Sequence, residues 1–389
     1  MNAPSLNSWS KPLFARGLLV ASLLVALAAA TGPGQAVAQE KLKIGFGGAL
    51  LGNLATYGLS NFYGLEYAVL DINKKGGIRG QQVEIVSEDD SCVPAKATEA
   101  AEKLLSSKVR FVLGHSCSGA TRAALKVYGD KALVVSSSAT EFSLTEDGKS
   151  PYFFRTTPRD DIQVKLQLAL IKKNNYKKIA IVHDNGDYGQ SLAAMTKKMI
   201  DEDLSGELKA VVYEGVVSGQ LSFEPVIAKV VDAEAEALVW CGYYNDAAKL
   251  AAQLLQNNVK ITLIGPDGLN DKRYVNIAQK AAEGTFCTGQ IDYSQSAAAR
   301  VALADHRRRY YSREIGSFFF YSAGAAQALF AALEKVGPEA DFPTIKRRLT
   351  EDTVETVMGP IRFDSKGDVI GAGFKIFVID HGRFVEVNL

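Results

Sequence analysis

The feature of this 389-residue sequence that most restricts its fold is a repeated alternation of short apolar runs with amphipathic stretches of helical period. Between Ala97 and Leu105, apolar residues recur at positions i, i+3, i+4, i+7 and i+8, and the same spacing returns between Ala247 and Leu255. That spacing is typical of one buried helix face. Strands that alternate with such helices predict βαβ units and parallel sheets.

The alternation occurs twice, with a change at Tyr152–Pro158 (YFFRTTP). We interpret this segment as a crossover between two lobes of similar architecture. After Gln290 the pattern predicts two long helices, over 296–313 and 318–336, and then only short strands, which complete the lobes already begun. The apolar runs of strand length are 42–48, 82–87, 109–114, 132–136, 178–183, 209–216, 237–241, 260–265 and 284–288.

The N-terminus has the features of an export signal. Lys11 and Arg16 precede an apolar run over Gly17–Ala30, and Ala36–Ala38 supplies the small residues of a cleavage site. The run is shorter than the roughly 20 apolar residues that span a bilayer. We therefore predict a signal peptide over residues 1–38, cleavage near Ala38 and an exported protein.

The cysteines and the charge balance fit a free exported protein. No cysteine follows the apolar run until Cys92, so no site for a lipid anchor lies at the mature N-terminus. Four cysteines in an exported chain permit disulfides in three pairings, among which the sequence alone does not choose. The formal net charge of +1 gives no argument for binding nucleic acid or an anionic membrane.

Motifs of enzymes are incomplete in this chain. A dinucleotide-binding turn beginning at Gly45 would need glycine where Leu50 stands. The segment Gly114–Ser118 lacks the final glycine of the serine-hydrolase motif G-x-S-x-G. Histidines are scattered without metal-ligand spacing. We predict no catalytic centre, no cofactor and no metal site. The histidines are His115, His183, His306 and His381.

Small polar and aromatic residues gather where predicted strands end. Ser116–Gly119 and Ser136–Thr140 follow two strands of the first half. Open α/β sheets bind ligands at the carboxyl ends of their strands. A serine at a helix N-terminus suits a carboxylate, and an acidic side chain beside hydroxyl acceptors suits an ammonium group. The pattern predicts a site for a zwitterion, split between two lobes. The matching residues of the second half are Tyr188, Tyr243, Tyr244 and Asp267.

Short motifs along the mature chain also carry a resemblance. They begin with Tyr57-Gly58, GLEYAVLDINKKGGIRG at 64–80 and Asp89–Pro94. Further motifs follow in order at 114–118, 139–140, 154–157, 181–189, 265–268, 356–360 and 363–368. In this order and spacing, the sequence resembles the leucine/isoleucine/valine-binding protein family, the type I periplasmic solute receptors of ABC importers.

The resemblance implies an α/β fold of two similar Rossmann-like lobes with parallel central sheets, joined by a three-stranded hinge. We expect lobe 1 to comprise residues 39–158 and 290–371, and lobe 2 residues 159–289 and 372–389. The implied function is to capture an amino acid, of the branched-chain or aliphatic class, between the lobes in the periplasm. The implied partner is the inner-membrane ABC permease with its cytoplasmic ATPase, and no enzymatic activity is implied.

The resemblance also implies roles for the head-group residues. Ser118, at a helix start, would bind the ligand carboxylate, helped by the backbone of Ser138. Thr140 would contact both the carboxylate and the ammonium group. Asp267, where the family usually has glutamate, would neutralise the ammonium group from the second lobe. Ala139 belongs to the same expected ligand-binding set.

Other residues are expected to enclose the ligand or support its site. The resemblance implies that Cys92 and Cys117 pair and hold the Ser118 loop. Cys241 and Cys287 have no counterpart and are expected to be buried free thiols. Ser116 stands where relatives place an apolar residue, and Ser137 replaces a proline, which affects the choice of ligand side chain. The expected enclosing residues are Tyr188 and Tyr244 over the ligand, and Tyr57 and Phe318 along its side chain.

Two alternatives remain at the level of sequence. A receptor of the same fold could bind a solute other than an amino acid, such as an aromatic carboxylate, an amide or a urea-like compound, and Asp267 would then meet no ammonium group. An exported hydrolase could use Ser116 or Ser118 with a distant histidine.

Overall fold

The computed structural model describes residues 40–311 and 315–389, and Lys41–Leu389 forms one compact unit. The predicted signal peptide, residues 1–38, lies outside the described residues. Within the described ranges, no helix has the length and apolar character needed to cross a bilayer.

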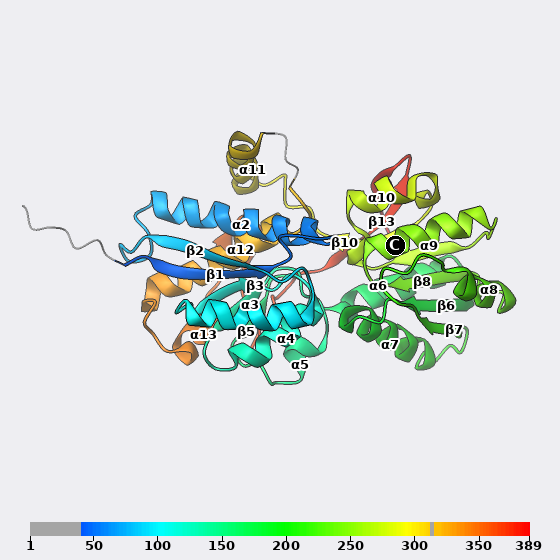
Figure 1. Ribbon diagram of the computed structural model, residues 1–389, viewed down its shortest axis with the longest axis horizontal. Coiled ribbons are helices and arrows are strands. Elements are labelled where there is room, and N and C mark those ends of the chain that lie inside the picture. Colours follow the sequence, from blue (N-terminus) through cyan, green and yellow to red (C-terminus); the bar gives the residue numbers. More distant parts are fainter. Residues whose placement is uncertain (1–39, 312–314) are drawn as a thin grey trace, which may run out of the picture. The chain divides into compact units, whose positions relative to one another are not determined.

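The first part of the chain builds a five-stranded sheet in the order β2-β1-β3-β4-β5, and all its strands run parallel (Figure 1). Each strand is joined to the next by a helical crossover, as the alternation predicts. The strands are β1 (Leu42–Gly48), β2 (Val83–Asp89), β3 (Phe111–Gly114), β4 (Leu133–Ser136) and β5 (Phe153–Arg155).

Both faces of this sheet are buried, because its side chains alternate between two apolar clusters. Phe111 and Leu113 of β3 pack with α2 (Ala55–Lys74) and α12 (Phe319–Val336). Val112 between them points to the opposite face, where α3 and α4 pack. The remaining elements associated with this sheet are α3 (Pro94–Ser106), α4 (Ser118–Tyr128), α5 (Ser143–Glu146), α11 (Ala297–Tyr310), α13 (Phe342–Glu351), β11 (Val354–Thr356) and β12 (Gly359–Ile361).

The contact between α2 and α12 depends on Gly64. A Cβ atom at this position would lie 2.2 Å from the carbonyl oxygen of Phe319 and 2.9 Å from the amide nitrogen of Ala323. We expect Gly64→Ala to lower the free energy of unfolding by roughly 2 kcal/mol or more, although alanine is the better helix former, because the backbones must move apart. Urea denaturation measures this loss. Gly373→Ala is the control, since a Cβ there meets no atom within 4 Å, and an equal effect of both substitutions would contradict the prediction.

The second part of the chain builds a seven-stranded sheet in the order β14-β13-β10-β9-β8-β6-β7. Strands β6 to β10 are parallel and repeat the strand order of the first sheet. The strands are β6 (Lys178–His183), β7 (Lys209–Gly215), β8 (Ala237–Cys241), β9 (Thr262–Gly265), β10 (Phe286–Gln290), β13 (Phe374–Asp380) and β14 (Arg383–Val387). The helices are α6 (Asp160–Lys173), α7 (Asp187–Asp201), α8 (Glu224–Asp232), α9 (Tyr244–Gln256) and α10 (Lys272–Ala278), with short 3-10 turns η2 (Asp267–Leu269) and η3 (Gln279–Ala282).

One edge of the seven-stranded sheet differs from the sequence expectation of parallel sheets. Strand β13 pairs antiparallel with β10, and β14 pairs antiparallel with β13. Strand β13 comes directly from the first sheet without a helical crossover. It therefore starts beside the end of β10 and runs in the opposite direction to β10. A parallel partner would need a longer connection over the sheet.

The chain passes between the two sheets three times. These passages lie between β5 and α6 (156–159), between β10 and α11 (291–296), and between β12 and β13 (362–373). The α/β class and the repeated order of parallel strands confirm the predicted fold. The predicted strands are all present with ends shifted by up to two residues, and the predicted helix 296–313 is found as α11, over Ala297–Tyr310.

Candidate functional site

Residues at the carboxyl ends of strands from both sheets line one small cavity of about 20 Å³. A space of this size holds about one water molecule, so a larger occupant requires the walls to separate. A larger hollow of about 770 Å³ borders α2, α10 and α11, but it contains none of these strand-end residues. The residues that line the small cavity are Tyr57, Ser116, Ser118, Ser138, Thr140, Tyr188, Tyr243, Asp267, Gly268 and Phe318.

One end of the cavity has groups that suit an anion. Strand β3 leads into the start of α4, where Ser118 is the first helical residue and is buried. The first N–H groups of a helix lack partners within the helix, and its N-terminus carries partial positive charge. The Ser118 Oγ accepts a hydrogen bond from the amide of Glu141 at 3.3 Å, so its hydroxyl proton remains to be donated.

The serines beside α4 are oriented by Asn61 of α2. Its side-chain amide donates to the Oγ of Ser116 at 3.1 Å and to the Oγ of Ser138 at 2.7 Å, and its oxygen accepts from Ser137 at 3.0 Å. Ser138 in turn donates to the carbonyl oxygen of Ser116 at 2.7 Å. Sequence reasoning missed Asn61, because an asparagine within a helix gives no local signal of contacts so distant in the chain.

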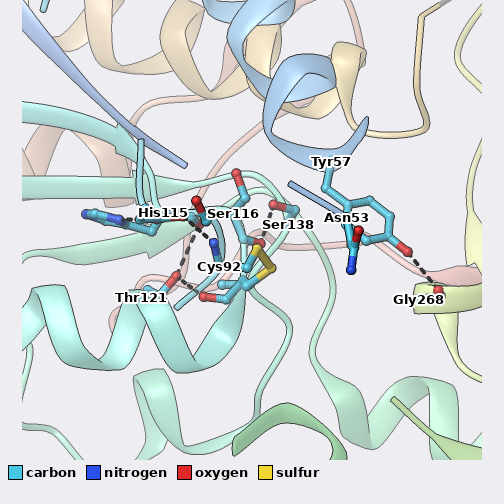
Figure 2. Close-up of a disulfide and its surroundings, with 12 residues drawn as sticks. Asn53, Tyr57, Cys92, His115, Ser116, Thr121, Ser138 and Gly268 are labelled. Carbon is cyan, nitrogen blue, oxygen red and sulfur yellow. Dashed lines mark hydrogen bonds and ion pairs between the residues drawn. A yellow bond between two sulfur atoms is a disulfide. The ribbon is translucent and has the colours of Figure 1, made fainter. Parts of the chain in front are cut away.

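A disulfide lies directly beneath the start of α4 (Figure 2). Cys92 and Cys117 are bonded, with Cα atoms 5.4 Å apart, so the pairing implied by the family resemblance is confirmed. Cys117 immediately precedes Ser118, and the bridge therefore ties the helix start to the loop after β2. Cys241 and Cys287 are free and buried as expected, and burial raises the pKa of both thiols.

His115 has a structural environment. Its Nδ1 lies 2.6 Å from Asp90 Oδ2 and its Nε2 lies 3.0 Å from the Oη of Tyr128, all three residues being buried. Its carbonyl accepts a hydrogen bond from Thr121 at 3.1 Å (Figure 2). Both ring nitrogens are thus directed away from Ser118, and the ring supports the turn before α4. Over residues 40–311 and 315–389, no group of side chains has the arrangement needed to hold a metal ion.

The other end of the cavity carries Asp267, at the turn η2 that follows β9. Its Oδ1 accepts hydrogen bonds from the Tyr188 hydroxyl at 2.6 Å and from Gln163 at 3.1 Å, and its Oδ2 accepts one from Gln290 at 2.7 Å. Burial raises the pKa of Asp267, and these hydrogen bonds oppose the rise. A buried carboxylate held by neutral donors favours a cationic partner.

Aromatic rings form the remaining wall. The Tyr57 hydroxyl donates to the carbonyl oxygen of Gly268 at 2.7 Å and so joins α2 to η2 across the cavity (Figure 2). The ring of Tyr57 lies 5.8 Å from that of Phe318 and 5.9 Å from that of Tyr243, measured between centroids. Tyr243 also lies 5.2 Å from Tyr188. This wall offers an apolar, closely fitted surface.

Two residues of the expected set do not line the cavity. The side chain of Tyr244 points away from it and donates to the carbonyl oxygen of Asn53, while Tyr243 takes its place. Tyr243 is the last extended residue before α9, and the first helical residue turns to another side. Ala139 contributes backbone contacts instead, donating to Ser136 Oγ at 3.1 Å and accepting from Arg155 at 3.3 Å.

Comparisons with known proteins agree with this geometry. A sequence profile described as periplasmic binding protein matches residues 41–383. The Leu/Ile/Val-binding protein of Escherichia coli (strain K12) is 32% identical over 340 residues, covering 87% of this chain and 90% of that protein. A leucine-, isoleucine-, valine-, threonine- and alanine-binding protein of Pseudomonas aeruginosa is 31% identical over 357 residues, covering 91% and 94%.

A solved structure shows the same arrangement. The substrate-binding protein of a branched-chain amino acid transporter from Streptococcus pneumoniae, in complex with isoleucine, superimposes with a TM-score of 0.77. It is 27% identical in sequence, and the match covers 90% of this chain and 100% of that one.

Proposed function

This chain belongs to the periplasmic binding protein family, and from that premise we propose that it is a receptor that captures an amino acid between its two sheets for an ABC importer. The observation that carries the proposal is the pairing of opposite charge preferences within one cavity. The helix start at Ser118 favours a carboxylate, and Asp267 favours an ammonium group. A free α-amino acid presents both groups on one carbon atom.

The proposed ligand class is aliphatic, with branched-chain amino acids first. Its support is the wall formed by Tyr57, Tyr243 and Phe318, together with the amino acids bound by the relatives named above. Burial of an aliphatic side chain against such a wall contributes roughly 1.5 to 3 kcal/mol. Ser116 adds one polar group to this end of the cavity, which permits a small hydroxyl-bearing side chain as well.

The proposed mechanism is closure of two lobes around the ligand. We assign lobe 1 to residues 39–158 with 290–371, and lobe 2 to residues 159–289 with 372–389. The support is the pair of separate sheets and the three passages of the chain between them. Ligand binding would shift the population toward the closed form, which the permease would recognise.

The proposed location is the periplasm, with the leader removed near Ala38, no lipid anchor and no direct membrane insertion. The proposed partners are the inner-membrane permease subunits and their cytoplasmic ATPase. The family profile and the similarity to the substrate-binding protein of a branched-chain amino acid transporter support both assignments. No catalytic role is proposed for Ser116 or Ser118, since both serve the binding cavity.

Isothermal titration calorimetry on the mature chain tests this function. The panel contains L-leucine, L-isoleucine and L-valine, with polar and aromatic amino acids and benzoate as comparisons. We expect micromolar or tighter binding of an aliphatic amino acid, which corresponds to roughly −8 kcal/mol. The proposal fails if no amino acid binds, and binding of benzoate alone would instead indicate a receptor for simple carboxylates.

A further inference from the structure

A second carboxylate lies behind the cation-binding end of the cavity. Asp160 is the first residue of α6, and its side chain is fully buried. Its Oδ1 accepts a hydrogen bond from Gln163 Nε2 at 2.6 Å, and the same nitrogen donates to Asp267 Oδ1 at 3.1 Å. Its backbone amide donates to the carbonyl oxygen of Thr140 at 3.0 Å, which places Asp160 one residue behind the cavity wall. One amide group therefore links the two carboxylates.

The positive side chains nearest to Asp160 in sequence form their bonds with other acids. The Nε of Arg155 lies 2.5 Å from Asp368 Oδ1, and the remaining nitrogens of Arg155 contact backbone carbonyls and a threonine. The Nε of Arg159 lies 3.1 Å from Asp161 Oδ1. Neither arginine forms a hydrogen bond with Asp160 in the described part of the chain.

The other titratable groups that act on Asp160 are acidic or neutral. Asp267 and Glu141 both raise its pKa through their negative charge, and Tyr188, Tyr243 and Cys241 face it as neutral groups whose own pKa values are raised. Burial is the largest cause and raises the pKa of Asp160 to about 8, while hydrogen bonding by Thr140 and Gln163 opposes the rise.

Two buried carboxylates without a facing cation cannot both be ionised at neutral pH, because like charges and desolvation act together. The pair titrates as a unit. We propose, building on the amino-acid receptor function, that Asp160 is a charge-specificity residue: with Asp267 it forms an acid pair that holds one proton when the cavity has no ligand and releases it when a ligand ammonium group binds. The incoming positive charge takes over the role of that proton.

The direction of the pH dependence follows from this exchange. Below about pH 8 the unliganded pair is protonated, so binding must displace a proton and is weaker. Above about pH 8 the unliganded pair has already lost this proton, so binding is tighter there. A ligand with a carboxylate but no ammonium group gains nothing from the second negative charge, so the pair selects for cationic head groups.

The test is the dissociation constant of L-leucine, or of the amino acid in the panel that binds most tightly, at about pH 6 and about pH 8.5. We expect the wild-type protein to bind at least about fivefold more tightly at the higher pH. For Asp160→Asn, which resembles the protonated acid, we expect less than about a twofold change. The dissociation constant of the variant should equal that of the wild-type protein at about pH 6 and exceed it at about pH 8.5.

A matched control and a second readout separate this inference from its premise. Asp161→Asn removes the next carboxylate of the same helix turn, which is paired with Arg159 and Lys165, and should keep the wild-type pH dependence. Calorimetry at about pH 7 in buffers with different ionisation enthalpies should report proton release for the wild-type protein and not for Asp160→Asn. Amino-acid binding with the same pH profile in both proteins overturns the inference alone, whereas absence of amino-acid binding overturns the proposed function with it.

Discussion

Asp267→Ala is expected to weaken amino-acid binding by at least about a hundredfold, or about 2.7 kcal/mol, because the ligand ammonium group would be buried without its negative partner. Binding of 4-methylpentanoate, which has the carbon skeleton of leucine without the amino group, should change by less than about threefold. Calorimetry with both ligands measures the contrast. Equal losses for the two ligands would contradict the assignment of Asp267 to the ammonium group.

Controls separate this effect from general damage to the protein. Asp267→Asn keeps the shape of the side chain and should show the same selective loss, although Tyr188, Gln163 and Gln290 would retain a partner for hydrogen bonding. Removal of an exposed carboxylate at the end of α8, by Asp232→Asn, should leave the binding of both ligands unaffected. Thermal denaturation should show that each variant is folded. Burial disfavours the charged form of Asp267 and raises its pKa, so the loss of this charge should not destabilise the fold.

Loss of the disulfide is expected to have the largest effect on stability. The bridge closes a loop with a sequence separation of 25 residues, and the chain-entropy relation gives roughly 3 to 4 kcal/mol for such a loop. The double variant Cys92→Ser, Cys117→Ser should lose this amount in urea denaturation. Because Cys117 precedes Ser118, the same variant should also bind its amino acid less tightly.

Reducing agent supplies the matching experiment. Dithiothreitol under denaturing conditions should destabilise the wild-type protein by a similar amount and leave the double serine variant unchanged, since Cys241 and Cys287 are free in both proteins. A difference below about 1 kcal/mol between oxidised and reduced wild-type protein would show that the native structure does not depend on the constraint.

The sequence was informative where the signal is local. The apolar periods of strands and helices depend on neighbouring residues, so the alternation of strands with helices, and from it the parallel pairing of the central strands, could be predicted. A general property of parallel sheets also predicted that Ser118 and Asp267 each lie at the carboxyl end of a strand, where such sheets bind ligands. The two residues belong to different sheets, and the family resemblance implied that they would meet. The antiparallel edge formed by β13 and β14 could not be predicted in this way, because it depends on the side from which the chain arrives.

The residues that sequence reasoning missed act through distant partners. Asn61 orients serines that lie at least 55 residues away, and Gln163 and Gln290 hold Asp267 from different elements. Asp160 and Asp161 look alike in the sequence, as acids at a helix start. Only packing distinguishes the fully buried Asp160 from Asp161, which forms ion pairs with Arg159 and Lys165. Tyr243 and Tyr244 were separated by where α9 begins, which a sequence pattern places only within a residue or two.

The bond from Tyr57 to Gly268 and that from Tyr244 to Asn53 both join elements of the two sheets around a space with room for about one water molecule. Both hydrogen bonds must break before these elements of the two sheets can move apart around this space. If a ligand leaves by such a separation, the rate at which these two hydrogen bonds break sets an upper limit on its rate of dissociation.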